Sequence, residues 1–455
     1  MREVRDPIHG FIGRTELEQE IIDAPAFQRL RRIRQLAMAS LVYPGAVHTR
    51  FDHSLGAMHV AGRIARSVRL NDEDVRLIRL AALLHDIGHG PFSHVSEPVL
   101  ETFTKRENLP EGQKTQIHEA LTAAIIQLDS SIAPLLSERD REKIAGILSG
   151  TFGHSVMKDI VSGPLDADKQ DYLLRDSYFC GVRYGLYDLD RLSECLIGHE
   201  DSEDRYLAIT QDGVHALEQF VLAKYYMTTQ VYRHKIRLIT DGMIQRALIL
   251  GISKDRIEWL KRLYAYDGSK EYLDEYKNWT DERLIHEVPL NRTPDGFMKN
   301  LFLRLMARQL HKRIASFRVS EFHDPLVRNA LADLAASDRE AIESDVGKAF
   351  SLEPEFVIVN SFDIKSVREQ ARNSEASVSV LTPEGPVDFE AESALFRSID
   401  EAVKEKYIEV YAPVTYQDEK EKRRKQKDYK QEIRRILIEF TKSSQAAKGE
   451  PKDET

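Results

Sequence analysis

Three histidines and two aspartates in this chain have the types and spacing of a metal-dependent hydrolytic site. His85, Asp86 and His89 lie in one short segment, with His53 upstream and Asp168 downstream. Imidazole and carboxylate groups together bind Zn, Mn or Fe(II) without any thiolate. Residues four apart share a face of a helix, so a helix through this segment would bring His85 and His89 to the same side. The pattern predicts a metal site and with it a reaction class.

A His-Asp pair alone carries little information, because the chain contains a second one at His323-Asp324. We expect that second pair to cap a helix or lie on the surface. His85-Asp86 differs in its surroundings, since an apolar run over residues 75–84 leads into it and two glycines and a proline follow it. These breakers should end the helix, leaving His89 and His94 at its end or just beyond. The context therefore favours a metal site at His85-Asp86.

An ion with open positions for water and substrate needs further ligands, and the residues alone leave several candidates. The upstream candidates are imidazoles and the downstream ones carboxylates: His48, His53 and His59, and Asp166, Asp168 and Asp171. Periodicity cannot choose among them. Asp168, Tyr172 and Asp176 nevertheless recur at four-residue intervals, so one helix face would carry all three polar groups. Such a stripe on a buried helix is expected to line a pocket.

The elements that must position these residues are predominantly helical. Apolar residues recur at helical spacing over residues 54–70, 117–128 and 217–239. The sequence therefore predicts a mainly α protein whose helical, metal-binding domain covers residues 1–310.

After about residue 310, short β-branched or alternating runs predict strands at Phe356–Phe362, Ser377–Leu381 and Tyr407–Tyr411. We expect these to form a small antiparallel sheet in an α+β C-terminal lobe over residues 311–441. The lobe would end in a highly charged, exposed helix at Gln417–Phe440. Residues beyond it, 442–455, have almost no apolar content and are expected to be disordered.

The composition indicates a globular protein without a global affinity for polyanions. The chain has 455 residues, of which 42% are hydrophobic and 31% charged, and its net charge is −9. Nucleic acid is thus a possible local partner that the net charge does not indicate. Two cysteines are too few for a disulfide framework. With no apolar run long enough for a membrane span, we expect a cytoplasmic protein that does not contact membranes.

Several further motifs resemble the HD-domain phosphohydrolases, and among them the deoxynucleoside triphosphate triphosphohydrolases. The resemblance begins at Asp6–Gly10 and extends, more weakly through the C-terminal lobe, to Tyr411. Between these points the matching motifs are Phe27–Arg31, Arg34–Leu36, Tyr43–Gly45, Arg50–Gly56, His85–His94, Asp168–Tyr172, Arg175–Asp176 and Tyr232–Lys235. Members of this family cleave a deoxynucleoside triphosphate (dNTP) into the deoxynucleoside and inorganic triphosphate. The resemblance implies the same reaction here.

The resemblance also assigns the metal ligands, as His53, His85, Asp86 and Asp168. A divalent Fe, Mn or Zn ion at these residues would activate a water for attack on the α-phosphorus, with Mg accompanying the phosphates. By its position in the motif, His94 would be the general acid that protonates the departing 5′-oxygen. His89 and His118 match positions near the phosphates, and Glu97 would orient His89.

Further positions match residues that bind the substrate in this family. Arg50 and Lys169 match phosphate contacts, which suits a strongly anionic triphosphate. The other matching positions are Gln35, Leu36, Tyr172 and Asp176, of which Gln35, Tyr172 and Asp176 surround the sugar 3′-hydroxyl. Tyr232 matches the aromatic residue that packs against C2′ and leaves no space for a ribose hydroxyl. The resemblance therefore implies selection of deoxynucleotides by shape.

An effector site is also implied. Family members bind a guanine nucleotide, GTP or dGTP, between subunits, and this binding stabilises an active tetramer. The residues that read the guanine base match Asp23, Gln28 and Arg31. We therefore expect a homo-oligomer, a dimer or a tetramer, with a possible allosteric nucleotide.

Two other functions fit parts of the pattern. The same metal site could act on a nucleoside monophosphate, a cyclic nucleotide or an alarmone, although the Arg50 and Lys169 pair favours a polyphosphate. Alternatively, the chain could be a nucleotide-sensing or nucleic-acid-binding module in which catalysis is secondary. The match at the guanine site and the basic segment at 420–435 motivate that interpretation.

Overall fold

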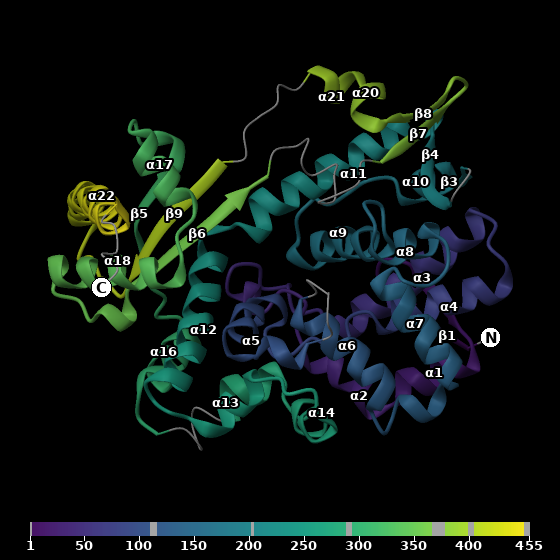
Figure 1. Cartoon of the computed structure of the whole chain (residues 1–455), viewed down its shortest axis with the longest axis horizontal. Helices are drawn as coiled ribbons and strands as arrows, with labels where there is room; N and C mark the ends of the chain where they lie inside the picture. The colour runs from purple at the N-terminus through teal and green to yellow at the C-terminus, as the bar shows by residue number, and fades with distance from the viewer. Residues whose placement is uncertain are drawn as a thin grey trace, which may run out of the picture. The chain divides into compact units, whose positions relative to one another are not determined.

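The computed structural model of the chain describes residues 2–109, 116–201, 204–287, 294–365, 378–398 and 405–449. The chain divides into two compact units, each built from separated stretches (Figure 1). Unit 1 comprises Met1–Arg237, Arg256–Thr293 and Val367–Ala402, and unit 2 comprises Leu238–Asp255, Pro294–Ser366 and Val403–Thr455. The predicted division into domains at residue 310 stays a prediction.

Unit 1 is mainly helical, as the sequence predicts. Its helices up to residue 180 are α1 (Glu16–Asp23), α2 (Pro25–Gln28), η1 (Arg29–Arg32), η2 (Ala39–Leu41), α3 (Arg50–Ser67), α4 (Asp72–Leu84), η3 (Ser93–Val95), α5 (Glu97–Phe103), η4 (Arg106–Asn108), α6 (Ile117–Leu128), η5 (Ala133–Leu135), α7 (Glu138–Ser149), α8 (Ser155–Ser162) and α9 (Ala167–Cys180). Its later helices are α10 (Leu189–Cys195), η6 (Gln211–Gly213), α11 (Val214–Tyr226), η7 (Met227–Tyr232), α13 (Glu258–Tyr264), α14 (Lys270–Tyr276), η8 (Arg283–Glu287), α20 (Phe389–Glu392) and α21 (Ala394–Ser398).

The centre of unit 1 is α3, which packs against both α4 and α9. Each of these helices begins at a residue suited to capping. Thr49 donates its amide to the Asp52 carboxylate at the start of α3, over 2.8 Å. The Asn71 side chain accepts the Asp74 amide in α4, and Asp166 accepts the Lys169 amide in α9. Capping fixes where each helix starts, and so fixes which face its polar residues occupy.

Two small sheets accompany these helices. An antiparallel hairpin pairs β1 (Arg2–Asp6) with β2 (Gly10–Arg14). A second sheet has the order β3 (Leu196–Glu200), β4 (Arg205–Thr210), β7 (Ser379–Thr382) and β8 (Gly385–Asp388), in which β4 and β7 run parallel. The predicted strand at Ser377–Leu381 therefore exists as β7, but it lies in unit 1 and not in a C-terminal sheet. Its hydrogen-bonding partner β4 comes from much earlier in the chain, and local alternation cannot reveal that pairing.

The helix predicted over residues 217–239 is interrupted. α11 ends at Tyr226, the wide turn η7 follows, and α12 (Lys235–Ser253) starts afterwards. In η7 the Thr228 and Thr229 hydroxyls bond back to carbonyls one turn earlier, at Lys224 and Tyr225. Hydroxyls that compete for backbone carbonyls distort a helix without altering its apolar periodicity. The prediction of one continuous helix was wrong at the place where Tyr232 lies.

Unit 2 contains the antiparallel sheet that the sequence predicts for the C-terminal region. Its order is β5 (Lys312–Arg318), β9 (Glu405–Ala412) and β6 (Ile358–Ile364). The accompanying helices are most of α12, together with α16 (Phe297–Met306), η9 (Val319–Glu321), α17 (Pro325–Ala332), α18 (Ala336–Phe350), η10 (Pro354–Phe356) and α22 (Glu419–Gly449). The mainly α class with a short antiparallel sheet is confirmed. Strand β5 was not predicted.

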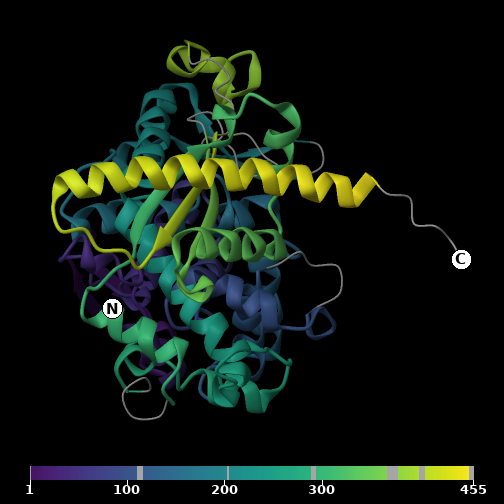
Figure 2. The same cartoon turned by 90° about the vertical axis from the view of Figure 1, so that its left-hand side faces the viewer.

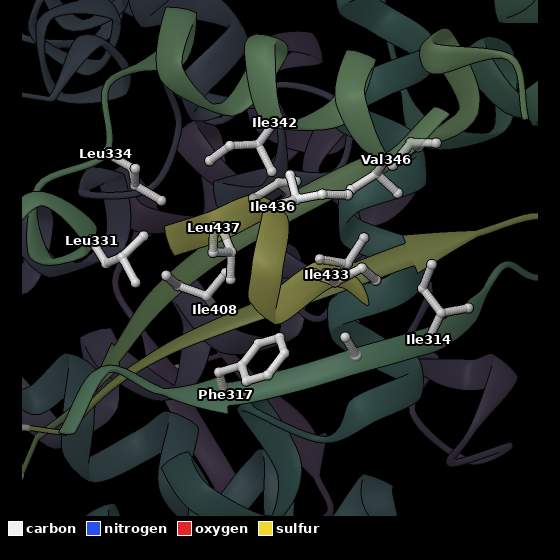
Figure 3. Packing of buried hydrophobic residues seen from close by; sticks show 14 of the residues in the cluster. Ile314, Phe317, Leu331, Leu334, Ile342, Val346, Ile408, Ile433, Ile436 and Leu437 are labelled. Carbon is white, nitrogen blue, oxygen red and sulfur yellow. The ribbon is translucent and has the colours of Figure 1, made fainter. Parts of the chain in front are cut away.

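The core of unit 2 lies between this sheet and α17, α18 and α22 (Figures 2 and 3). Ile433, Ile436 and Leu437 of α22 are buried against Phe317 and Ile408 of the sheet. The charged helix predicted at Gln417–Phe440 is therefore only partly exposed, because its last turns present an apolar face to the core.

The end of α22 and the start of α17 also test predictions from the sequence. α22 continues to Gly449, past Lys442, where the composition predicts a disordered tail; extending an existing helix costs far less than starting one. Residues 450–455 lie outside the described residues. Asp324 caps α17 by accepting the Leu326 amide over 2.9 Å, which confirms the capping role expected for His323-Asp324.

Among the described residues, no helix has the length and apolar content needed to cross a membrane.

Candidate metal centre and substrate site

Three helical elements bring the predicted metal ligands together. His53 is the fourth residue of α3, and Asp168 lies in the first turn of α9. α4 ends at Leu84, so His85 and Asp86 lie in the turn that follows it. The expectation that breakers end this helix is confirmed. The four-residue spacing predicted that His85 and His89 share a helix face. That prediction was wrong, because the helix ends before both residues.

The four side chains converge around one point. His53 Nε2 lies 2.9 Å from Asp168 Oδ1 and 3.7 Å from Asp86 Oδ2. His85 Nε2 lies 3.3 Å from Asp86 Oδ1 and 3.7 Å from the same Asp168 oxygen. His53 and Asp86 are buried, whereas Asp168 is about one-third exposed. The cluster is thus enclosed on most sides and open at Asp168.

Both imidazoles are oriented so that Nε2 faces the cluster. His53 Nδ1 bonds to the Asp171 carboxylate over 2.8 Å, and His85 Nδ1 bonds to the Ala82 carbonyl over 2.7 Å. The two Nε2 atoms are buried and have no well-oriented hydrogen-bond partner among the described residues. A metal-bound histidine has this arrangement, with one nitrogen held by an outer acceptor and the other directed at the ion. The residues present therefore fit a divalent metal.

Asp171 is a positioning residue that sequence reasoning considered only as a rival ligand. It is buried, and besides His53 it bonds to His9 Nε2 over 2.7 Å. Arg175 grips both of its oxygens, at 2.8 Å each, and also bonds to Asp6. The carboxylate thus connects the N-terminal hairpin to α3 through α9. Among the other rival ligands, Asp166 caps α9, and the rings of His59 and His9 lie 5.2 Å apart.

The charges of the cluster shift several pKa values. Burial opposes the protonation of His53, but the Asp168 and Asp171 carboxylates outweigh it and raise its pKa to about 10. Burial would raise the pKa of Asp168, yet His53 and His85 lower it. These shifts favour ionised carboxylates, which is the form that binds a cation.

A second group of three histidines lies beside Asp86. The rings of His89 and His118 stack at 3.9 Å, and the His94 ring lies 4.5 Å from that of His89. His89 and His118 are buried while His94 is exposed, so the group has one accessible edge. Burial and the Arg50 guanidinium hold the pKa of His89 well below its usual range.

The predicted contact of Glu97 with His89 is not direct. Glu97 Oε1 accepts the His118 amide over 3.2 Å, and Oε2 lies 3.1 Å from His118 Nδ1. Glu97 therefore orients His118, which in turn stacks on His89. The sequence pointed to Glu97 but paired it with His89, whereas its partner in the structure is His118.

The two predicted phosphate-binding cations have carboxylate partners in this structure. Arg50 is buried, its Nη1 bonds to Asp86, and its Nη2 has no hydrogen-bond partner among the described residues. Lys169 Nζ bonds to Asp166 over 2.5 Å. Arg50 is bonded to the ligand cluster at Asp86 and still has a hydrogen-bond donor available at Nη2. Lys169, in contrast, would have to break its bond to Asp166 to reach a phosphate.

Three of the predicted sugar-binding residues lie side by side: Tyr172 and Asp176 on α9 and Tyr232 at the end of η7. Tyr232 donates to Asp176 Oδ2 over 2.6 Å, and its ring lies 6.2 Å from that of Tyr172. His48 Nε2 bonds to the other Asp176 oxygen over 2.7 Å and stacks on Phe179. His48, a rival metal ligand in the sequence, therefore holds Asp176 instead. The stripe of Asp168, Tyr172 and Asp176 along one helix is confirmed.

Gln35 and Leu36 adjoin this network through the backbone. The Gln35 amide donates to the His48 carbonyl over 3.1 Å. The Gln35 side-chain oxygen is buried without a hydrogen-bond partner among the described residues, and Leu36 is buried. An unpaired buried amide oxygen is available to a ligand hydroxyl.

The predicted effector residues lie in three successive elements near the N-terminus: Asp23 in α1, Gln28 in α2 and Arg31 in η1. Arg31 Nε donates to Gln28 Oε1 over 2.9 Å, and the Arg31 guanidinium lies 3.5 Å above the Phe51 ring. Asp23 instead accepts a hydrogen bond from Gln19 over 2.7 Å. Asp23 and Arg31 are exposed, and Gln28 is half-buried.

Comparisons with known proteins agree with this geometry. The HD domain family matches residues 50–160, and the HD associated region matches residues 188–429. An uncharacterized protein of Methanocaldococcus jannaschii is 30% identical over 442 residues, which are 97% of this chain and 84% of that protein. A hypothetical protein of Aquifex aeolicus, known as a crystal structure, has a TM-score of 0.69 and 28% identity, with 90% of this chain and 96% of that chain covered.

A relative whose name states an activity is less similar. The deoxynucleoside triphosphate triphosphohydrolase SAMHD1 of Gallus gallus is 26% identical over 380 residues, which are 76% of this chain and 62% of that protein. The chain thus spans about three-fifths of that enzyme's length.

Proposed function

Because the chain belongs to the HD-domain family, with an HD domain followed by an HD associated region, we propose that it is a metal-dependent triphosphohydrolase of dNTPs. The products would be the deoxynucleoside and inorganic triphosphate. The observation that carries the proposal is the convergence of His53, His85, Asp86 and Asp168 beside the three-histidine group and Arg50. Within the described residues, the two Nε2 atoms face the carboxylates without a well-oriented hydrogen bond. The similarity to SAMHD1 enzymes, which are named as deoxynucleoside triphosphate triphosphohydrolases, supports the choice of substrate.

The proposed ligands are His53, His85, Asp86 and Asp168, for Fe, Mn or Zn, with Mg accompanying the phosphates. When bound, the ion would supply Lewis-acid activation of a water molecule and of the α-phosphate. Asp171 and the Ala82 carbonyl fix the tautomers of the two histidines, so that each presents a lone pair at Nε2.

The phosphates would lie along Arg50, His89 and His118. Arg50 has a free donor at Nη2, and His89 Nδ1 is buried without a hydrogen-bond partner among the described residues. Glu97 holds the stacked His118 ring through Nδ1. His94 lies at the exposed edge of this group and would protonate the departing 5′-oxygen. Lys169 would exchange Asp166 for a phosphate oxygen. Desolvation and the Arg50 guanidinium lower the pKa of His94 to about 3. A bound triphosphate would oppose this shift, because anionic oxygens stabilise an imidazolium.

The deoxyribose would lie between Tyr172 and Tyr232. The Tyr232 hydroxyl is already bonded to Asp176, which holds the tyrosine ring in one orientation. A ring held in place excludes the extra 2′-hydroxyl of a ribonucleotide by contact. Gln35, Leu36 and Asp176 would complete the contacts with the sugar.

We further propose that GTP or dGTP binds as an effector at Asp23, Gln28 and Arg31 between subunits of a dimer or tetramer. Gln28 accepts from Arg31 Nε and donates to the Ile22 carbonyl, so the remaining Arg31 donors could read a guanine edge. Asp23 would have to leave Gln19 to take part.

A product assay tests the proposal. The purified protein is incubated with each dNTP and Mn²⁺ or Mg²⁺, with and without GTP or dGTP, and the products are separated by anion-exchange chromatography. We expect inorganic triphosphate and the deoxynucleoside. Pyrophosphate or orthophosphate as the only inorganic product would contradict this chemistry and favour an HD hydrolase of another nucleotide.

The two His-Asp pairs offer a matched control. His85→Ala should abolish triphosphate release, whereas His323→Ala should leave it unchanged, since Asp324 only caps α17. Activity that survives His85→Ala would refute the metal site. Salt-dependent nucleic-acid binding that survives His85→Ala, in a protein without hydrolysis, would instead favour a binding module.

A further inference from the structure

His94 follows a backbone turn of unusual conformation. Phe92 and Ser93 have φ values of 65° and 55°, in the left-handed region that side chains other than glycine rarely adopt. Within the described part of the chain, they are the only two consecutive non-glycine residues with positive φ. Strain of this kind persists only where the surroundings hold the backbone in place.

The buried carboxylate of Asp281 bonds to this turn and to a second segment at once. Its Oδ1 accepts the Phe92 amide over 2.7 Å, and its Oδ2 accepts the Arg34 amide over 2.9 Å. Asp281 lies two residues before η8 and is 189 residues away from Phe92 in the sequence. Both oxygens are thus used to tie together backbones that are otherwise separate.

Ser93 closes the connection from the other side. Its hydroxyl donates to the Arg34 carbonyl over 2.8 Å and accepts from Arg50 Nε over 2.8 Å. The Arg34 peptide is therefore held at its amide by Asp281 and at its carbonyl by Ser93. One short unit connects the residue before His94, the residue before Gln35, and Arg50.

We propose that Asp281 is a positioning residue that holds the Phe92–Ser93 turn against the Arg34 segment, and thereby sets His94 relative to Gln35 and Arg50 for the reaction. The proposal rests on the proposed function, since His94, Gln35 and Arg50 have their roles there. Asp281 itself touches no reacting group. Its effect is geometric: the proton donor and the sugar-binding residue come from different segments, and the Asp281 carboxylate bonds to a backbone amide in each of them.

The electrostatic surroundings of Asp281 give the clamp a pH dependence. Burial raises the pKa of Asp281 to about 6, against the opposing effect of the two backbone hydrogen bonds. The ionisable groups that face it are Arg29 of η1, Arg34, Arg50 of α3 and Tyr264 of α13. As the pH falls through about 6, a protonated oxygen can no longer accept from a backbone amide, so the clamp weakens.

Asp281→Asn tests the proposal with little change in shape. The amide nitrogen cannot accept, so one of the two backbone bonds is lost. We expect kcat for dNTP hydrolysis to fall roughly 10- to 100-fold, as displaced reacting groups do, with KM and metal content little changed. Because wild-type Asp281 also loses its acceptor in acid, the ratio of wild-type to variant kcat should shrink between pH 7.5 and pH 5.

Asp255→Asn is the matched control. The Asp255 carboxylate likewise accepts two backbone amides, from Phe297 and Met298, but it belongs to unit 2. Asp255→Asn should lose a backbone hydrogen bond and some folding stability, as Asp281→Asn does, but it should leave kcat unchanged. An equal loss of kcat in both variants, or a ratio for Asp281→Asn that does not change with pH, would overturn the proposal.

A readout independent of activity separates this proposal from the function. Exposed His94 can be modified with diethyl pyrocarbonate and quantified by mass spectrometry, with exposed His154 as an internal reference. Asp281→Asn should change the rate at His94 severalfold and leave His154 alone. If wild type releases no triphosphate but this change occurs, the proposed function fails and the clamp stands. An unchanged His94 rate refutes the clamp even if dNTPs are hydrolysed.

A second variant covers the case in which Asp281→Asn does not fold. Ser93→Ala cuts the same unit at its other end by removing the bonds to Arg34 and Arg50. The same drop in kcat and the same change at His94 are expected. Wild-type values in a folded Ser93→Ala protein would refute the proposal.

Discussion

Replacing Asp171 by asparagine tests whether the contact behind His53 governs metal binding. The carboxylate accepts from His53 Nδ1 over 2.8 Å, so the proton on Nδ1 stays when a metal displaces the one on Nε2. Asparagine has one acceptor oxygen and one amino group in the same volume. If that oxygen stays with Arg175, the amino group faces His53 Nδ1 and favours the tautomer that has its proton on Nε2, which cannot bind a metal.

The size of the effect follows from this exchange. Losing such an outer contact lowers metal affinity about 10- to 100-fold, or about 1.4 to 2.8 kcal/mol. Folding stability should fall too, because breaking one side of a buried ion pair costs about 3 to 5 kcal/mol. Arg175 keeps its 2.8 Å bond to Asp6, so we expect the lower end of that range.

The assay is a titration of metal-free protein with Mn²⁺ or Zn²⁺ against a competing chelator, alongside urea denaturation. Asp190→Asn is the control, since Asp190 also pairs with an arginine, Arg63, but is 81% exposed. It should bind metal like the wild type. A folded Asp171→Asn protein with wild-type metal affinity would refute the idea that this carboxylate prepares His53 for the ion.

Two further predictions concern selectivity and acid sensitivity. Tyr232→Ala removes the ring that Asp176 holds, so the preference for dCTP over CTP in kcat/KM should fall about tenfold or more, whereas Tyr232→Phe keeps the ring and should keep the preference; unchanged selectivity in the alanine variant would contradict the steric role. Burial lowers the pKa of His311, with Arg304 nearby, to about 3, so on acidification the unfolded chain binds a proton there before the folded one does. Stability should therefore fall by about 2 kcal/mol between pH 6.5 and pH 5 on account of this residue, and urea denaturation of His311→Phe should show a correspondingly smaller loss than that of wild type or of exposed His154→Phe.

The roles of the site residues are predictions to different degrees. The convergence of His53, His85, Asp86 and Asp168 is a property of the structure, while their binding of an ion is what the titration measures. For Glu97, the motif correctly places the residue at the site but names the wrong partner, since Glu97 contacts His118 and not His89. The motif supplies the identity of the group, and packing supplies its contact.

The sequence by itself determined which residues could do the chemistry and which local elements would carry them. The types and spacing at His85-Asp86, the breakers after them and the polar stripe from Asp168 to Asp176 all depend on neighbours within a few residues, as do the helix at 117–128 and the capping role of Asp324. Periodicity and capping act over this range, so the sequence displays them directly.

Only the tertiary structure decided which polar groups hold the site in place. Asp171 meets His53 across 118 residues of sequence, and Asp281 meets Phe92 across 189. Strand β7 likewise pairs with the distant strand β4 and not with the sheet of unit 2, and local sequence does not show this pairing. A carboxylate or a strand satisfies its hydrogen bonds with whatever packing brings near, and packing depends on the whole chain. Local pattern therefore predicted the reactive groups, and long-range packing selected their supports.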